Sequence, residues 1–446
     1  MDTDLTRGNI LRHLIDFTIP LILGNLFQLS YNMVDTIVIG RFAGSSALAA
    51  VGTCDQVMNL MVLGVSGLCI GASVLMGNFY GAGDREKLLE EMKTMTAIGL
   101  LFAVIVMAVG IPLTGVIFTL MRVRPEMMRE ATVYLRIIFA GMPFTCLYNI
   151  YSAALRSIGD SKTPIRFLVI SCLINIALDL MLVVVFHMSV LGAALATVIA
   201  QACSAVLCII YVGQRVPMLH IDWRGLRIDR SLARQTLSYG GMTALQQCSQ
   251  PIGNIIIQSS VNALGVSAAA AFSAVRKIED IGLLPGRSIS TGITAFTAQN
   301  KGARDEARIQ QGFRVGLRME LVVGMAMCAV VLLLRSPLMS LFTQDAAIIA
   351  AGVRYFDLIG FCYALPCLTN GIQGYFRGIG RMRVTLFATL TQISVRVIAT
   401  LILSPVMGIS GVGLACVLGW TAMIAWELPL QMHIRRVGVL DRHHTA

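Results

Sequence analysis

Two aspartates of this chain lie inside long apolar segments, where an ionised side chain is costly. Asp179 is central in SCLINIALDLMLVVVF at 171–186, and Asp35 lies in PLILGNLFQLSYNMVDTIVIG at 20–40. An aspartate at the centre of a bilayer costs about 2.5–3.5 kcal/mol even on insertion scales, and such acids usually mark ion or proton pathways. We therefore expect both to bind a cation. For Asp35, nearer the end of its segment, a solvated surface acid is the alternative.

Further polar residues recur at helical spacing around these acids. One helix face bears Asn25, Gln28, Asn32 and Asp35, a second bears Ser171, Asn175 and Asp179, and a third bears Thr197, Gln201 and Ser204. If the faces meet, two carboxylates, an amide and a hydroxyl converge. We predict that Asp35, Asn175, Asp179 and Thr197 bind H⁺ or Na⁺, the latter being the metal that this set would suit. Interhelical hydrogen bonding is the alternative for Gln28, Asn32 or Gln201 taken singly.

The composition is that of an integral membrane protein. Of the 446 residues, 56% are hydrophobic and 13% are charged, against about 25% charged in soluble domains. Apolar segments long enough to cross a bilayer recur throughout, and they are too continuous for barrel strands. We predict an all-α membrane protein with twelve transmembrane helices, near 14–39, 53–79, 94–117, 131–153, 165–186, 190–212, 237–261, 268–297, 315–334, 346–374, 384–404 and 410–431.

The basic residues between these segments predict their orientation. Lys and Arg concentrate in alternate loops, such as 80–93, 156–166, 213–235 and 301–308. Cytoplasmic loops carry this excess, so both termini should be cytoplasmic in a multi-pass protein of the plasma (inner) membrane. The same placement explains the net charge of +11 without nucleic-acid binding.

The chain repeats itself at an offset of 221 residues. YGAGDREK at 80–87 aligns with KGARDEAR at 301–308, and LRSIGD at 155–160 aligns with FRGIGR at 376–381. We predict an N-lobe at 1–212 and a cytoplasmic linker at 213–236. A C-lobe with a cytoplasmic tail follows at 237–446. Six helices per lobe make the repeat parallel, a geometry that suits alternating access.

The repeat does not duplicate the acidic pocket. Asp35 aligns with Ile256, Asn175 with Arg396 and Asp179 with Thr400. The seventh helix keeps neutral polar residues instead, among them Gln250 and Asn254. A substrate cavity lined by Gln28, Asn32, Gln250, Asn254, Arg287 and Arg396 is expected. The pairing among Arg287, Glu320 and Arg396 is left open.

Several classes of protein are excluded by missing motifs. A phosphate-binding glycine loop followed by Lys and Ser or Thr does not occur, which disfavours an ATP-driven pump. Neither a His-acid cluster nor paired metal-ligand cysteines occur, so we expect neither an enzyme nor an organic cofactor. Nothing in the sequence demands a partner chain, and we expect a monomer in the lipid bilayer.

Four stretches of the sequence resemble the multidrug and toxic compound extrusion (MATE) family of the multidrug/oligosaccharidyl-lipid/polysaccharide superfamily. They are FQLSYNMVDTIVIGRFAGSSALAAVG, GNFYGAGDREK, LRSIGDSKTP and AQNKGARDEAR, and the resemblance covers about residues 10–435. It implies two six-helix lobes and a secondary antiporter that exports organic cations or other hydrophobic compounds in exchange for H⁺ or Na⁺.

The family's cation site matches Asp35, Asn175, Asp179 and Thr197. Some Na⁺-driven members carry an acid in helix seven, where this chain has only Gln and Asn, so coupling by the first lobe alone is expected. The alternative is a flippase for a lipid-linked anionic precursor, because Arg287 and Arg396 would suit anionic head groups.

Overall fold

The computed structural model describes residues 4–439, and no β-strand occurs among them. The α-helices are α1 (Ile10–Val38), α2 (Ser45–Gly81), α3 (Arg85–Leu120), α4 (Pro125–Ser157), α5 (Lys162–Asp179), α6 (Ser189–Arg215), α7 (Arg230–Asn262), α8 (Val266–Gly282), α9 (Leu284–Gly302), α10 (Glu306–Ser340), α11 (Ala346–Ile359), α12 (Ala364–Gly378), α13 (Met382–Met407) and α14 (Ile409–Val437). The predicted all-α class is confirmed, and residues 440–446 of the predicted tail lie outside the described residues.

Each predicted span falls on one of these helices or on a divided pair. Nine helices of residues 4–439 are long and apolar enough to cross a membrane, and the bent pair α11–α12 makes a tenth candidate. The spans predicted at 268–297 and 346–374 as single helices are each divided in two, at Leu283 and near Tyr363. Pro285 and Pro366 lie just inside the second helix of each pair. Proline lacks a backbone amide hydrogen and is well tolerated in the first turn of a helix, where both of these prolines lie.

The repeat is visible in the helix ends. When 221 is added to its residue numbers, α2 matches the range of α8 and α9 together. In the same way α3 matches α10, and α4 matches α11 and α12 together. Counting each divided pair once, the described chain has six helical segments in each half, as predicted. The left-handed turns between helices repeat as well. Positive φ angles occur at the equivalent pairs Gly44 and Gly265, Gly83 and Arg304, Gly159 and Gly380, and His187 and Gly408.

The described chain forms two compact units. Within residues 4–439, unit 1 contains 23–80 and 84–244, and unit 2 contains 4–22, 81–83 and 245–439. Helix α1 therefore contributes its first turns to unit 2 and the rest to unit 1. The predicted domain boundaries at 212 and 237 stay predictions, since a compact cluster of contacts is not by itself a domain that folds alone.

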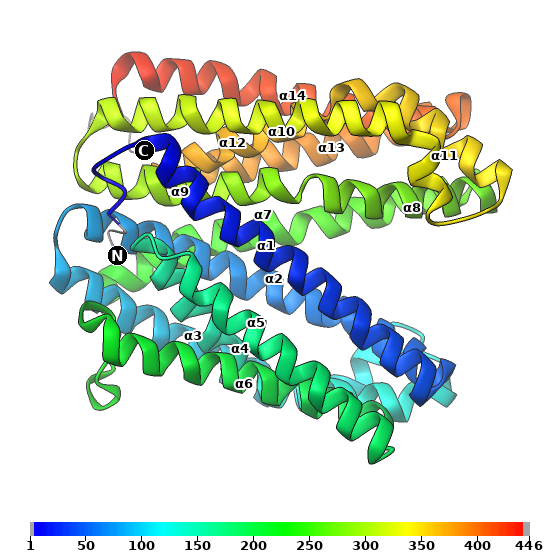
Figure 1. Cartoon of the computed structure of the whole chain (residues 1–446), viewed down its shortest axis with the longest axis horizontal. Coiled ribbons are helices and arrows are strands. Elements are labelled where there is room, and N and C mark those ends of the chain that lie inside the picture. Colours follow the sequence, from blue (N-terminus) through cyan, green and yellow to red (C-terminus); the bar gives the residue numbers. More distant parts are fainter. Residues whose placement is uncertain (1–3, 440–446) are drawn as a thin grey trace. The chain divides into compact units, whose positions relative to one another are not determined.

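Unit 1 is built around the helices α2 to α6 (Figure 1). α4 packs against both α3 and α6, and α6 packs against α5. Two close approaches place α2 against the first half of α7, where Gly67 and Gly71 face the backbone of Ala244 and Gly240. A Cβ at either glycine would overlap that backbone, so the glycines permit this packing.

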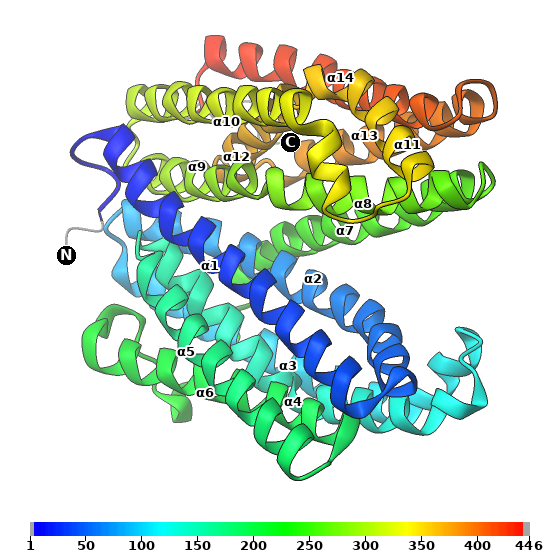
Figure 2. The same ribbon diagram turned by 45° about the vertical axis from the view of Figure 1, so that its right-hand side comes forward.

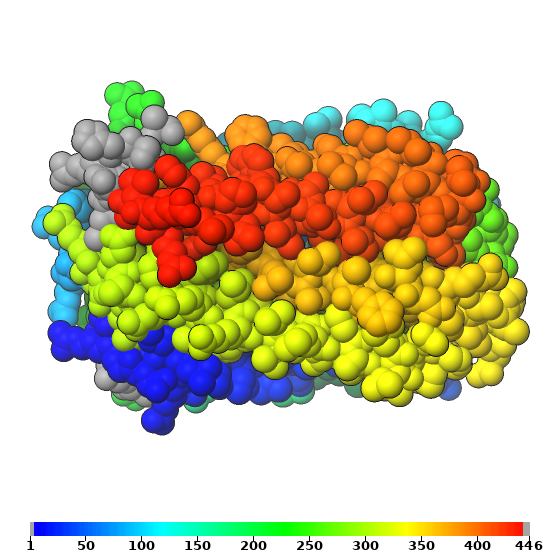
Figure 3. Space-filling model, turned by 90° about the horizontal axis from the view of Figure 1, so that it is seen from above, coloured from blue at the N-terminus to red at the C-terminus, as the bar shows by residue number. Residues whose placement is uncertain are grey.

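Unit 2 is built around α9, α10, α12, α13 and α14. α13 packs most extensively on α14, and α12 packs on both α9 and α10, which Figure 2 shows from a second direction. On the face shown in Figure 3, α10, in yellow-green, and α14, in red, run across the surface. The core of this unit includes Tyr355, Tyr363 and Tyr375, whose side chains are fully buried.

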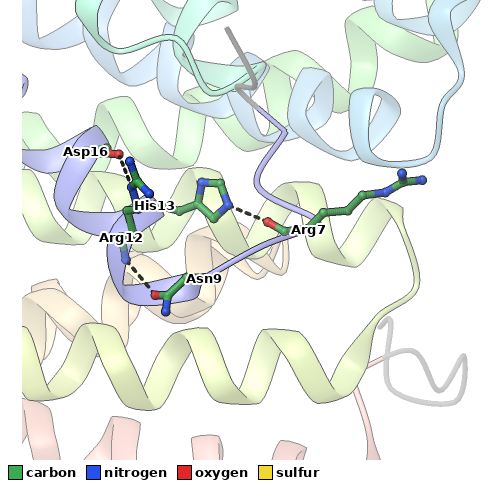
Figure 4. Close-up of polar contacts among 5 residues, drawn as sticks. All are labelled: Arg7, Asn9, Arg12, His13 and Asp16. Atoms are coloured by element: carbon green, nitrogen blue, oxygen red, sulfur yellow. Dashed lines mark hydrogen bonds and ion pairs between the residues drawn. The ribbon is translucent and has the colours of Figure 1, made fainter.

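The start of α1 is fixed by local polar contacts (Figure 4). Asn9 accepts a hydrogen bond from the Arg12 backbone N–H at 3.1 Å, as an N-cap residue does. Arg12 and Asp16 form an exposed ion pair at 3.7 Å. The His13 ring contacts the Arg7 carbonyl, which ties the preceding segment to the helix.

Candidate functional site

The two predicted acids lie at the ends of α1 and α5, within unit 1. Asp35 is in the last turn of α1, and Asp179 is the last residue of α5. Each helix continues as a π-helical turn, at Ile39–Ala43 and Leu180–Val185, and these two turns contact each other. π-Helical turns are rare and frequently occur at functional sites. Here they follow both acids of the predicted pair.

The structure brings the two carboxyl groups together. The Asp35 and Asp179 side chains are within hydrogen-bonding reach of each other. Asp179 is buried and Asp35 is half-buried. One buried oxygen of each, Oδ1, has no hydrogen-bond partner among the described residues. Two carboxylates in such contact repel unless a proton or cation lies between them.

Asn175 and Thr197 complete the set. With the Asn175 amide nitrogen turned toward Asp179, it donates to Asp179 Oδ2 at 2.8 Å. The amide oxygen then accepts from the Thr197 backbone N–H at 3.1 Å. This orientation satisfies both amide atoms. The sequence thus grouped Asp35, Asn175, Asp179 and Thr197 correctly in space, while their binding of a cation stays a prediction.

Sequence inspection missed three neighbours of this pair. The Tyr31 hydroxyl hydrogen-bonds to the Thr197 side chain and lies within electrostatic reach of both acids. Tyr134 and Asp55 lie within reach of Asp35. Tyr31 precedes Asp35 by four residues, so helical spacing alone could have placed it on the same face. Nothing in the sequence brings α2 and α4 to the site.

A cavity adjoins the site within unit 1. It is lined by residues of α2, α4 and α6, which include Met58, Met61, Phe139, Met142, Thr197 and Gln201. Methionine and phenylalanine give this cavity an adaptable apolar wall. Gln201 Oε1 is buried without a hydrogen-bond partner in the described chain. Thr197 belongs to both the cavity and the acidic site.

The other residues predicted to line a substrate cavity do not line this one. Gln28, Asn32 and Gln250 are exposed, and Asn254 is half-buried. Their contact with a substrate stays a prediction.

The predicted arginines of unit 2 have acidic neighbours. Arg287 is exposed and pairs with Asp280 at 3.1 Å. Arg396 lies within electrostatic reach of Glu279 and hydrogen-bonds to Cys416. Glu279 in turn accepts from the Tyr363 hydroxyl at 2.9 Å. Glu320 faces Arg377 instead, which answers the pairing question that the sequence leaves open.

The four side chains of the acidic site offer oxygen atoms to a proton or to Na⁺, and two of the four already make hydrogen bonds to other groups. The Asn175 oxygen already accepts a hydrogen bond. The Thr197 hydroxyl donates to the Ala193 carbonyl at 3.0 Å and also bonds Tyr31. Groups of three or more His, Cys, Asp or Glu that could hold a metal are absent from residues 4–439. The two unpartnered carboxylate oxygens would be the ligands that Na⁺ finds, whereas a shared proton needs only the carboxyl pair.

Comparison with known proteins gives consistent matches over both halves. The MatE family profile matches residues 20–181 and 243–402. The probable multidrug resistance protein YoeA of Bacillus subtilis is 29% identical over 76% of this chain and 75% of its own length. YpnP, a probable multidrug resistance protein of the same organism, is 27% identical over 92% of both chains. A solved outward-facing MATE family multidrug resistance transporter superposes with a TM-score of 0.90, at 23% identity and 98% coverage of both chains.

Proposed function

Because the chain belongs to the MatE (MATE) family of transporters, with matches in both halves, we propose that it exports hydrophobic organic cations by secondary antiport. The coupling ion is a proton held by Asp35 and Asp179. The observation that supports this most is the contact between these carboxyls, each with a buried oxygen that lacks a partner. The protein is a multi-pass membrane protein of the plasma membrane with cytoplasmic termini.

Repulsion between the two ionised carboxylates can shift the equilibrium between two conformations of the protein. When the shared proton leaves, two negative charges about 4 Å apart repel by about 4 kcal/mol at an effective dielectric constant of 20. That energy shifts a two-state equilibrium by roughly a thousandfold. Each acid is followed by a π-helical turn, where the helix has one extra residue per turn and its hydrogen bonds can rearrange.

The cavity beside Thr197 is the proposed substrate site. Its methionines and Phe139 suit varied apolar groups, because such surfaces repack around different ligands. The unpartnered Gln201 oxygen would accept a hydrogen bond from a substrate N–H. A cationic substrate near the ionised pair is stabilised, and the returning proton removes that attraction. Proton binding and substrate binding therefore oppose each other, because the cavity and the acidic site share Thr197.

The flippase alternative has lost its main support. It rested on Arg287 and Arg396 as free cations for an anionic head group. Asp280 pairs with the first and Glu279 lies beside the second, so neither guanidinium lacks a counter-charge.

Efflux of ethidium from proteoliposomes tests the proposal, with either a pH gradient or a Na⁺ gradient imposed alone. We expect the pH gradient to drive efflux, and the Asp35→Asn/Asp179→Asn variant to lose at least 100-fold of it. The matched control is Glu126→Gln, because Glu126 is exposed and the change is equally conservative. Efflux that needs Na⁺ would contradict the proton, and efflux that survives the double substitution would contradict the site.

A further inference from the structure

Unit 2 contains a second group of buried charged side chains, separate from the acidic pair of unit 1. Glu320 on α10 and Glu427 on α14 have no exposed surface. Arg377 on α12 lies within electrostatic reach of both. The group therefore contains one fixed positive charge and two carboxyl groups. Three helices contribute one member each, so the group exists only in the folded unit.

Both carboxyl groups lack the hydrogen bonds that a buried ionised carboxylate needs. Neither oxygen of Glu320 has a partner among the described residues, and neither oxygen of Glu427 makes a hydrogen bond of ordinary geometry. The ion pairs within 4.0 Å in residues 4–439 do not include Arg377, Glu320 or Glu427. An ionised carboxylate without such bonds is strongly disfavoured in an apolar interior.

Among residues 4–439, Arg377 is the positive charge within electrostatic reach of Glu320. Glu320 packs beside Gly286, where a Cβ would lie 2.8 Å from Oε2, and beside Gly371. The titratable groups that face it are Arg377 and Cys367, both from α12. A neutral Glu320 suits this site because neither a thiol nor a glycine backbone compensates a negative charge.

Glu427 and Arg377 have polar neighbours that fix their positions. The Gln373 amide faces Glu427 and donates to Thr389 Oγ1 at 3.0 Å. Gln246 donates to Gln373 Oε1 at 2.8 Å. Arg377 Nη2 donates to Ser290 Oγ at 2.8 Å, and its buried Nε has no partner in the described chain. Arg377 is the charged side chain that lies within electrostatic reach of Glu427.

We propose that Glu320, Arg377 and Glu427 form a second proton-binding site, in which the two glutamates share one exchangeable proton and Arg377 balances the carboxylate that remains. Charge neutrality of the buried group requires one proton, because the arginine stays charged. Both glutamates interact with Arg377, so protonation of one leaves the arginine to balance the other. The site is independent of the transport proposal, since it needs neither substrate nor Asp35 and Asp179.

Infrared absorption of protonated carboxyl groups tests the sharing directly, on the purified full-length protein. The Asp35→Asn/Asp179→Asn variant serves as the parent, so that the pair of unit 1 does not contribute. We expect Glu320→Gln to remove the signal of one protonated carboxyl. Glu427→Gln should remove the same amount, because the remaining glutamate then ionises against Arg377. The Glu320→Gln/Glu427→Gln combination should remove no more than either single change.

The outcomes separate sharing from its rivals. Two independent protonated glutamates would give additive losses in the combined variant, and two ionised glutamates would give no loss in any variant. Either result would overturn the proposal. Arg377→Gln provides a second measurement in the opposite direction, since both glutamates should then be protonated and the signal should grow. Gel-filtration elution and melting temperature identify any variant that fails to fold.

Discussion

The acidic site of the first half and the equivalent positions of the second half carry side chains of different charge. At the offset of 221, Arg396 replaces Asn175, Thr400 replaces Asp179 and Ile256 replaces Asp35. The second half thus has a positive charge attached to the chain, with Glu279 beside it. The first half has two acids, each with one buried oxygen that lacks a hydrogen-bond partner in the described chain.

The cavity follows the same division. Met58 and Met142 line the cavity of unit 1, and their equivalents are Glu279 and Tyr363. In unit 2 these two residues hydrogen-bond to each other at 2.9 Å. Two apolar side chains that border a cavity in unit 1 thus correspond to a glutamate and a tyrosine in unit 2 that hydrogen-bond to each other. The comparison teaches that one helical scaffold supports an acidic pair beside a cavity in one half and, at the equivalent positions of the other half, charged and polar side chains that contact each other.

Asn175→Arg would copy the fixed charge of the second half into the first, and has the largest expected effect. A guanidinium beside Asp179 would replace the mobile cation, so pH-driven efflux should fall at least 30-fold, by an energy of about 2 kcal/mol or more. Efflux from proteoliposomes at several imposed pH gradients measures it. Asn175→Ala is the control, because it removes the amide without adding charge and should keep a response to pH. An arginine variant with normal pH-driven efflux would break the comparison.

Arg396→Gln would remove the fixed charge of the second half. Glu279 then loses Arg396 and keeps Arg276 as a positive neighbour, and the protein should lose stability on the order of 3 kcal/mol, as expected when one member of a buried pair is removed. Melting temperature in detergent measures this loss. Adding Glu279→Gln should recover part of it, since the uncompensated acid is gone. If the double variant is no more stable than Arg396→Gln, the two residues are not coupled.

Met142→Tyr would introduce the second half's residue into the cavity of the first. The larger ring should fill space that a substrate needs, so the KM for a bulky cation such as tetraphenylphosphonium should rise about three- to tenfold, or about 1 kcal/mol. The pH dependence of efflux should not change, because no titratable group of the acidic pair is altered. Transport kinetics at two substrate sizes check this. A changed pH response with an unchanged KM would place Met142 in the cation site instead.

Asp84→Ala and Asp305→Ala should have small and similar effects on stability, because the two halves have the same helix cap at these equivalent positions. Each aspartate caps the following helix, accepting from the Lys87 N–H at 3.0 Å and the Arg308 N–H at 2.8 Å. The hydrogen bond from the Lys87 backbone, with its ammonium nearby, holds the pKa of Asp84 below its usual range. The cap therefore stabilises above the ordinary aspartate pKa and is lost as pH falls through the lowered one.

The measurement for these caps is melting temperature against pH. Each variant should melt a few degrees below the parent at neutral pH. For Asp84→Ala the difference should shrink in acid. A large loss in only one variant would show that the equivalent loops differ.

The sequence was informative where residues lie on one helix or repeat at a fixed offset. Asn175 and Asp179 are one turn apart, and the 221-residue repeat aligns Asp84 with Asp305. The pairs that join different helices were not predictable in the same way. Glu279 with Tyr363 and Glu320 with Arg377 are separated by long stretches of chain, and only packing brings them together. The breaks at Leu283 and Tyr363 lie near prolines, which helices sometimes tolerate.

Proton release on substrate binding tests the central comparison most directly. Tetraphenylphosphonium is added to weakly buffered, purified protein, and a pH indicator reports the protons released. The wild type should release about one proton per chain, because the acidic pair shares one. The Glu279→Gln/Arg396→Gln variant should release the same amount, whereas Asp35→Asn/Asp179→Asn should release none. Release that persists without the two aspartates, or that vanishes with the second-half pair, would contradict coupling of the substrate to the acidic pair of the first half.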